Sequence, residues 1–415
     1  MRYGSKLDAT ALSKSFLPTM LTSAALVDCG SGHTGIHFYS ARDGAVTQHA
    51  RASLKHADGG NLPVTDCLTT TANADEFIAQ LNSVLSHQHD ADGFTPDILY
   101  IGATGGVRSA LDKGTITETQ LEAFRAALTS AFDGRMRIVK FEVLTGAQEA
   151  AWELDAAQAI WGGKASSMFP GEERTALKGI VVPTSTPDTP ATAATTDSIS
   201  RAPTTHADLA SLSDVAGAPP SIGLFSGGGQ SMQLARAGSA PLSFPFSTFP
   251  PSMEERQGAP ADAWLDDAIW GGFTDGLRET ISQEATRHDR YDGCFVGTAM
   301  NHRAALFTEI SETPITAAAA TAALRGSLRE FRGRQGPLYE RMMATKMGGP
   351  NYPLARIVAM HTYRLATVLE LMFEPHAKLF FARNGAGANG EPIDCEWTVG
   401  AFVAEACALS KAPGI

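Results

Sequence analysis

The sequence predicts an α/β protein made of two similar halves, and two glycine-rich turns are the main reason. The first lies in ALVDCGSGHTGIHFY (25–39), where small apolar residues lead into the turn and alternating residues leave it. The second, in SIGLFSGGGQSMQL (221–234), again lies between two apolar runs. Segments with helical periodicity separate and follow them. The repeat predicts a duplicated architecture with a ligand held between the halves.

The first turn has the residue types of half a metal–phosphate site. Asp28 ends a predicted buried strand, and Ser31, Gly32, His33 and Thr34 follow it. Glycines let backbone N–H groups approach an anion closely, and an aspartate at a strand end can hold a hydrated cation. The alternative is a plain hairpin whose aspartate caps its own turn.

Two further strand ends carry candidate polar residues. Thr104 and Arg108 lie in GATGGVR, after the predicted strand at 98–101. Thr104 can reach a phosphate oxygen at the N-terminus of the next helix, and Arg108 either contacts the ligand or pairs with a carboxylate. Glu149 follows the predicted strand at 137–143, in the first turn of a helix, where it can act as a general base or simply suit the helix dipole.

The chain divides at changes in composition. Residues 1–20 are a predicted leader. Residues 21–162 form a predicted first lobe, completed by a C-terminal helix at 395–415, and 163–394 form a second. Within the second, residues 183–220 are rich in Thr, Ala, Pro, Ser and Asp and are expected to be a disordered insertion. Thr117 and Gln120 predict a capping box for a helix ending near 131. Further helices are expected at 262–286, 301–312, 317–332 and 353–373.

Composition narrows the class of protein. Hydrophobic residues make up 43% and charged residues 19%, as in globular proteins, and the net charge of -11 argues against a nucleic-acid partner. No apolar run reaches the ~18 residues of a membrane helix. The five scattered cysteines indicate neither a zinc site nor a disulfide framework. We therefore expect a soluble, cytoplasmic protein without a signal peptide.

Five short segments together resemble a known family. VDCGSGHT, GATGGVR, TGAQEAAW, SGGGQSMQ and EWTVGA resemble, in order from Asp28 to Gly400, the five signature regions of the apyrase (nucleoside triphosphate diphosphohydrolase) family. The resemblance implies the duplicated, two-lobed actin-like ATPase (ribonuclease H-like) fold with a cleft between the lobes. It also implies hydrolysis of the terminal phosphates of nucleoside tri- or diphosphates, with Mg²⁺ or Ca²⁺ as the cofactor.

The same resemblance implies the roles of individual residues. Glu149, helped by Ser231, would align and deprotonate the attacking water, with no phosphoenzyme. Waters held near Asp28, Gln233 and Trp397 would surround the metal ion. The residues that would bind phosphate lie in the glycine turns and the GATGGVR segment: Ser31, Gly32, His33, Thr34, Thr104, Arg108, Gly228, Gly229 and Gln230.

One position departs from the family pattern. The fourth signature begins with an aspartate that helps to hold the metal's water shell, and Ser226 stands there in this chain. We expect weaker or altered metal binding as a result. Two alternatives stay open: the related exopolyphosphatase/guanosine pentaphosphatase group, and a nucleotide-binding protein that has lost turnover. The sequence predicts neither the base specificity, nor a preference for tri- or diphosphates, nor the oligomeric state.

Overall fold

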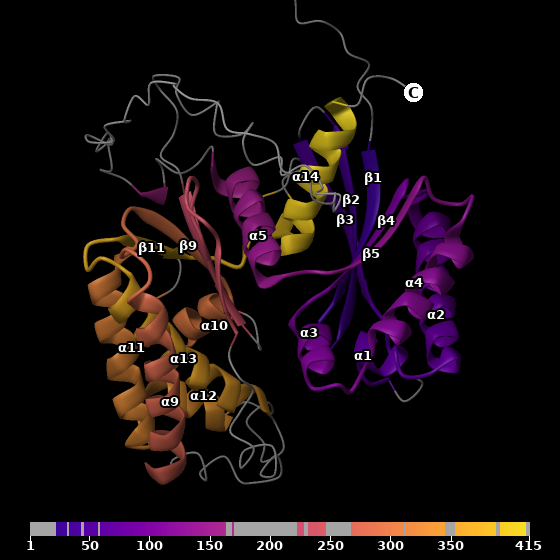
Figure 1. Ribbon diagram of the computed structural model, residues 1–415. Helices are drawn as coiled ribbons and strands as arrows, with labels where there is room; N and C mark the ends of the chain where they lie inside the picture. The colour runs from indigo at the N-terminus through magenta and orange to yellow at the C-terminus, as the bar shows by residue number, and fades with distance from the viewer. Residues whose placement is uncertain are drawn as a thin grey trace, which may run out of the picture.

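Two β-sheets organise the computed structural model, which describes residues 22–30, 33–42, 45–56, 59–162, 168–169, 222–227, 231–245, 267–310, 313–344, 353–386 and 391–411. Figure 1 shows the sheets side by side, each with its own helices. The predicted leader at 1–20 and the insertion at 183–220 lie outside the described residues.

The first sheet, with its helices, is here called lobe I. Its strand order is β3-β2-β1-β4-β5, with β1 (Thr22–Cys29), β2 (Thr34–Arg42) and β3 (Ala45–Ser53) antiparallel, and β4 (Ile98–Ala103) and β5 (Ile138–Val143) parallel to β1. Because successive side chains of a strand point to opposite faces, β1 contributes to two cores. One core joins the sheet to α1 (Val64–Cys67), α2 (Thr71–Asp92), α3 (Gly105–Asp112) and α4 (Glu118–Phe132).

The second sheet, with its helices, is lobe II. Its order is β10-β11-β9-β6-β7-β8, made of β6 (Ile222–Gly227), β7 (Ser231–Ala235), β8 (Leu242–Pro245), β9 (Cys294–Ala299), β10 (Ile315–Thr316) and β11 (Lys378–Phe381). Its outer face packs on helices α9 (Asp267–Ala285), α10 (Met300–Phe307), α11 (Ala317–Arg332) and α13 (Pro353–Met372), with α12 (Gly336–Ala344) beside them. A short hairpin of β12 (Asn384–Ala386) and β13 (Pro392–Asp394) leads into α14 (Trp397–Lys411).

The predicted duplication is confirmed by the strand pairing. In lobe I, β1 pairs antiparallel with β2 and parallel with β4; in lobe II, β6 pairs antiparallel with β7 and parallel with β9. Asp28 and Ser226 are each the second-last residue of the central strand of their lobe. The two positions are therefore equivalent.

Helix α5 (Gly146–Trp161) joins the two lobes. One core contains Leu26 and Tyr100 of lobe I, Leu224 and Val296 of lobe II, and apolar residues of α5 and α14. Figure 1 shows α5 and α14 lying together between the two sheets. The N-terminus of α5 touches lobe II directly, since a Cβ added to Gly146 would lie 2.2 Å from the Ser243 hydroxyl.

The predicted elements differ from the structure mainly at their ends. The Thr117–Gln120 capping box is confirmed at α4. The helix expected at 301–312 is too long, because α10 ends at Phe307 and Glu309 has a left-handed φ of 62°. Among the described helices, none is both long and apolar enough to cross a membrane.

Candidate active site

Asp28 lies at the end of β1, and Trp397 holds its side chain. The indole Nε1 of Trp397 donates a hydrogen bond of 3.1 Å to Asp28 Oδ1. The ring fits there because Gly102, paired with Asp28 across β1 and β4, has no side chain; a Cβ would lie 2.3 Å from the indole. An indole N–H donates one hydrogen bond and accepts none. Trp397 therefore positions the carboxylate, and its polar atom is occupied in doing so.

The surroundings of Asp28 favour its neutral form. Burial raises the pKa of Asp28 to about 7, and the negative charges of Glu396 and Glu149 act in the same direction, while the Trp397 hydrogen bond opposes them. Asp28 is half-buried, and a carboxylate removed from water in this way is stabilised by a proton or a positive charge beside it. Asp28 is therefore a candidate ligand for a cation.

Glu149 lies in the first turn of α5, next to Arg108 of α3. The helix begins at Thr145, which forms a capping box with Gln148 and so fixes the position of the first turn. Arg108 Nη2 lies 3.2 Å from Glu149 Oε2, and Arg108 Nη1 donates to the Leu144 carbonyl. Burial raises the pKa of Glu149 and the Arg108 charge opposes that shift. The sequence left open whether Arg108 contacts the ligand or pairs with a carboxylate. In the structure it pairs with the carboxylate of Glu149.

Glu153, which the sequence reasoning missed, lies one helical turn after Glu149. Ser226 Oγ donates a hydrogen bond of 3.2 Å to Glu153 Oε1, linking α5 to β6. The residue is 7% exposed, and its Oε2 has no hydrogen-bond partner in the described part of the chain. Burial, followed by the charge of Glu149, raises the pKa of Glu153 well above its ordinary value. The sequence signal that could have revealed Glu153 is its spacing of four residues from Glu149, because this spacing places both glutamates on one face of the helix.

Two other predicted residues lie beside Ser226, on β7. Gln233 is the strand partner of Ser226, and its Nε2 donates a hydrogen bond of 2.6 Å to Ser231 Oγ. Both side chains are buried. The structure therefore brings Ser226, Ser231 and Gln233 together at the end of lobe II that faces α5.

The phosphate-binding residues predicted for the glycine turns are only partly described. Ser31, Gly32, Gly228, Gly229 and Gln230 lie outside the described residues.

The other residues of that set lie at the first turn. The carbonyl of His33 accepts a bond of 3.0 Å from Gly30, and Thr34 begins β2 and is buried. Thr104 is the N-cap of α3, and its amide donates to the Cys29 carbonyl at 3.2 Å. These residues are in place around the first turn, and their contact with phosphate stays a prediction.

Within the described part of the chain, the acidic residues form no direct metal centre. Among the described residues, no three His, Cys, Asp or Glu side chains are grouped closely enough to hold a metal ion. Mg²⁺, which keeps several of its waters and uses few carboxylates, fits an arrangement of this kind. The buried, unpartnered Glu153 Oε2 is one position where such an ion or its water fits the chemistry present.

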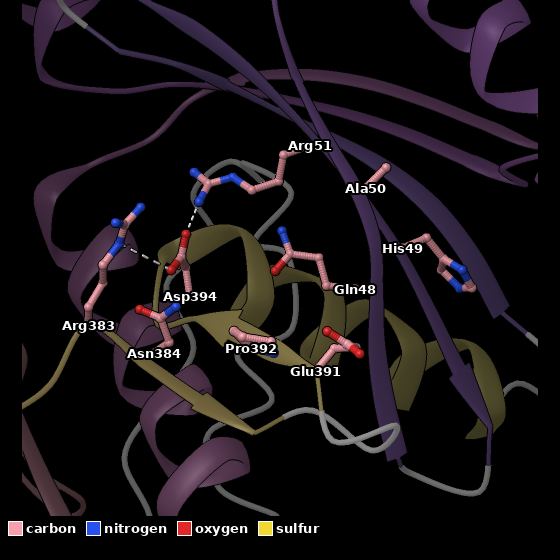
Figure 2. Close-up of a pocket in the computed structure, with 9 residues that line it drawn as sticks. All are labelled: Gln48, His49, Ala50, Arg51, Arg383, Asn384, Glu391, Pro392 and Asp394. Atoms are coloured by element: carbon pink, nitrogen blue, oxygen red, sulfur yellow. Dashed lines mark ion pairs between the residues drawn. The ribbon is translucent and has the colours of Figure 1, made fainter. Parts of the chain in front are cut away.

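A separate pocket of about 600 Å³ lies at the β3 edge of lobe I, and it contains none of these carboxylates. Figure 2 shows its lining side chains: Gln48, His49, Ala50, Arg51, Arg383, Asn384, Glu391, Pro392 and Asp394. Both arginines pair with Asp394, and Arg51 Nη2 also lies 3.1 Å from Glu396. The positive charge of the pocket is thus largely compensated, and we assign it no substrate.

Comparison with known proteins identifies the fold. No protein-family model matches the chain, and no curated protein matches it in sequence. Solved structures do match. A PPX-GPPA enzyme of Aquifex aeolicus is 14% identical with a TM-score of 0.50, over 93% of this chain and 100% of that one. The type II variant of the Ppx/GppA phosphatase of the same organism is 12% identical with a TM-score of 0.51, over 92% and 99%.

The chain has the actin-like ATPase fold. The duplicated sheets and the likeness over nearly the whole length of both chains support the same conclusion. At this level of identity the likeness concerns the fold alone. Asp28 and Ser226, at the ends of β1 and β6, each lie near a glutamate of α5: the charge of Glu149 acts on Asp28, and Ser226 donates a hydrogen bond to Glu153.

Proposed function

We propose that the protein is a divalent-metal-dependent hydrolase of phosphoanhydride bonds, which removes terminal phosphates from nucleoside tri- or diphosphates. One observation carries the proposal: Asp28, at the end of β1, and Glu149, in the first turn of α5, lie close enough for the charge of Glu149 to raise the pKa of Asp28. Two half-buried carboxylates with raised pKa values at the junction of two lobes are typical of a catalytic site.

Each residue has a role that follows from its contacts. Glu149 takes a proton from the attacking water; its raised pKa makes it a better base, and Arg108 keeps it oriented. Asp28, fixed by Trp397, and Gln233 would hold a hydrated Mg²⁺ or Ca²⁺ through waters. When bound, that ion neutralises charge on the phosphates, which is most of what phosphoryl transfer requires.

The phosphate tail would be bound by the glycine turns. We assign this role to Ser31, Gly32, His33 and Thr34 in the first turn and Gly228, Gly229 and Gln230 in the second, with Thr104 at the N-terminus of α3. Ser231, bonded to Gln233 in the structure, would align the water together with Glu149.

A second candidate substrate is a longer phosphate chain. Two solved proteins of similar fold are Ppx/GppA proteins, and this likeness makes polyphosphate or guanosine pentaphosphate a candidate substrate beside ordinary nucleotides. The net charge of -11 favours the shorter nucleotide, because a long polyanion needs a basic groove.

Phosphate release from ATP, ADP, GTP, UDP and polyphosphate, with Mg²⁺ or Ca²⁺, tests the proposal and separates the substrates. We expect Glu149→Gln to reduce the rate at least ~10²-fold, because it removes the base and keeps the shape of the side chain. Glu122→Gln, which changes a carboxylate in an exposed pair on α4, is the matched control and keeps full activity. Nucleotide binding without release, unchanged by Glu149→Gln, would instead identify a binding protein.

A further inference from the structure

The central strands of the two lobes carry different side chains at equivalent positions. Asp28 of β1 pairs with Gly35 and Gly102, and Ser226 of β6 pairs with Gln233 and Thr298 in the same pattern. Lobe I therefore has a carboxylate at the end of its central strand, and lobe II has a hydroxyl. Of the two central strands, only that of lobe I would therefore offer a carboxylate to a cation bound between the lobes.

Glu153 brings a carboxylate to the lobe II side. It projects from α5 to Ser226, whose Oγ lies 3.2 Å from Glu153 Oε1. Four residues earlier on the same helix, Glu149 turns to Arg108 of lobe I. One helix thus carries two carboxylates, and each contacts a different lobe.

The second oxygen of Glu153 is buried and without a partner. Glu153 is 7% exposed, and among the described residues no hydrogen bond or ion pair reaches Oε2. Thr298, the strand partner of Ser226, is fully buried and its hydroxyl also has no partner there. Paired residues of parallel strands point to the same face, and Leu224 and Val296 on that face of β6 and β9 belong to the core that also contains α5 and α14. Buried oxygens of this kind cost free energy unless something satisfies them.

We propose that the Glu153 carboxylate, held by Ser226, supplies the acid that the central strand of lobe II lacks, and that it binds the hydrated divalent cation together with Asp28. Carboxylate and hydroxyl oxygens are the ligands that Mg²⁺ and Ca²⁺ prefer, directly or through water. The inference rests on the proposed function in requiring a cation at this junction. The inference adds that Ser226 does not leave lobe II without an acid, because Glu153 supplies the negative charge that an aspartate at this position would carry.

Binding of Mn²⁺ alone to the full chain, measured as loss of the electron paramagnetic resonance signal of the free ion, tests this. We expect Glu153→Gln to lower the affinity for Mn²⁺ by about 10- to 100-fold. The double variant S226D/E153Q should recover most of that loss, since it returns a carboxylate to the strand end. The control Glu122→Gln should bind as the wild type does.

Thermal unfolding is the second measurement. Without metal, Glu153→Gln should be at least as stable as the wild type, because an amide replaces a buried acid, and it should lose most of the rise in Tm that Mn²⁺ causes. Unchanged Mn²⁺ binding, or a metal-free variant that is much less stable or does not fold, would overturn the inference and leave Glu153 as a structural partner of Ser226. The double variant failing to regain affinity would also count against it.

Phosphate release by the wild type separates this inference from the proposed function. If the wild type releases phosphate and Glu153→Gln binds Mn²⁺ as the wild type does, the inference is refuted and the proposed function stands. Loss of Mn²⁺ binding in that variant, without release from any substrate by the wild type, refutes the proposed function and keeps the cation site.

Discussion

The half-buried carboxylate of Asp28 predicts an unusual dependence of stability on pH in the metal-free protein. Its pKa is about 7 in the folded chain against an ordinary value of 3.8, so the native state holds the proton more tightly than the unfolded state does. The free energy of unfolding should therefore fall as the pH rises from about 4 to about 7. The difference in pKa corresponds to about 4 kcal/mol in total, of which about 2.5 kcal/mol is lost between pH 5 and pH 8.

Chemical denaturation of metal-free wild type and Asp28→Asn at several pH values measures this directly. The asparagine keeps an oxygen for the Trp397 indole and carries no proton to lose, so the variant should gain about 2.5 kcal/mol relative to the wild type between pH 5 and pH 8. Asp90→Asn, which changes an exposed carboxylate on α2, is the control and should follow the wild type. Saturating Mg²⁺ should stabilise the wild type most at the higher pH values. Equal pH dependence in wild type and Asp28→Asn would refute the reasoning.

The structure makes further predictions for packing and for the base. Gly400→Ala should destabilise the protein by roughly 1–3 kcal/mol, because the added Cβ would lie 1.6 Å from the Trp152 carbonyl, where α14 crosses α5. Gly326→Ala, also within a helix but with nothing within 4 Å of the added atom, should stabilise the protein by roughly 0.5–1 kcal/mol. Chemical denaturation measures the free energy of unfolding of both variants. A Gly400→Ala variant more stable than Gly326→Ala would contradict the packing of α14 on α5. Arg108→Gln removes the positive charge that opposes the rise in the pKa of Glu149, so the acid limb of the pH–rate profile should move to higher pH. An acid limb at the wild-type pH would show that Arg108 does not influence the general base.

Local pattern was enough for the parts of the site that belong to one segment. The strand that carries Asp28 and the helix that carries Glu149 each follow from a few adjacent residues, because strand and helix periodicity and end signals act over short distances. The duplication could be predicted for the same reason, since a similar local unit occurs twice. The error at the end of α10 arose where the chain leaves the helix through a left-handed residue with no glycine to mark it.

Contacts between distant segments could not be predicted in this way. Trp397 and Asp28 are 369 positions apart, and Ser226 and Glu153 are 73 apart. Which partner each side chain has depends on how α5 and α14 pack between the two sheets, and no local signal encodes that.

The sequence by itself thus determined the duplicated α/β architecture, the strand that carries Asp28 and the helix that carries Glu149, because all three follow from short-range pattern. Only the tertiary structure decided the electrostatics of the site. Burial at the junction of the lobes raises the pKa of Asp28, Arg108 is paired with Glu149, and Glu153 lies beside Ser226. Burial and charge proximity are properties of the assembled chain, so they exist only once both sheets have packed on α5.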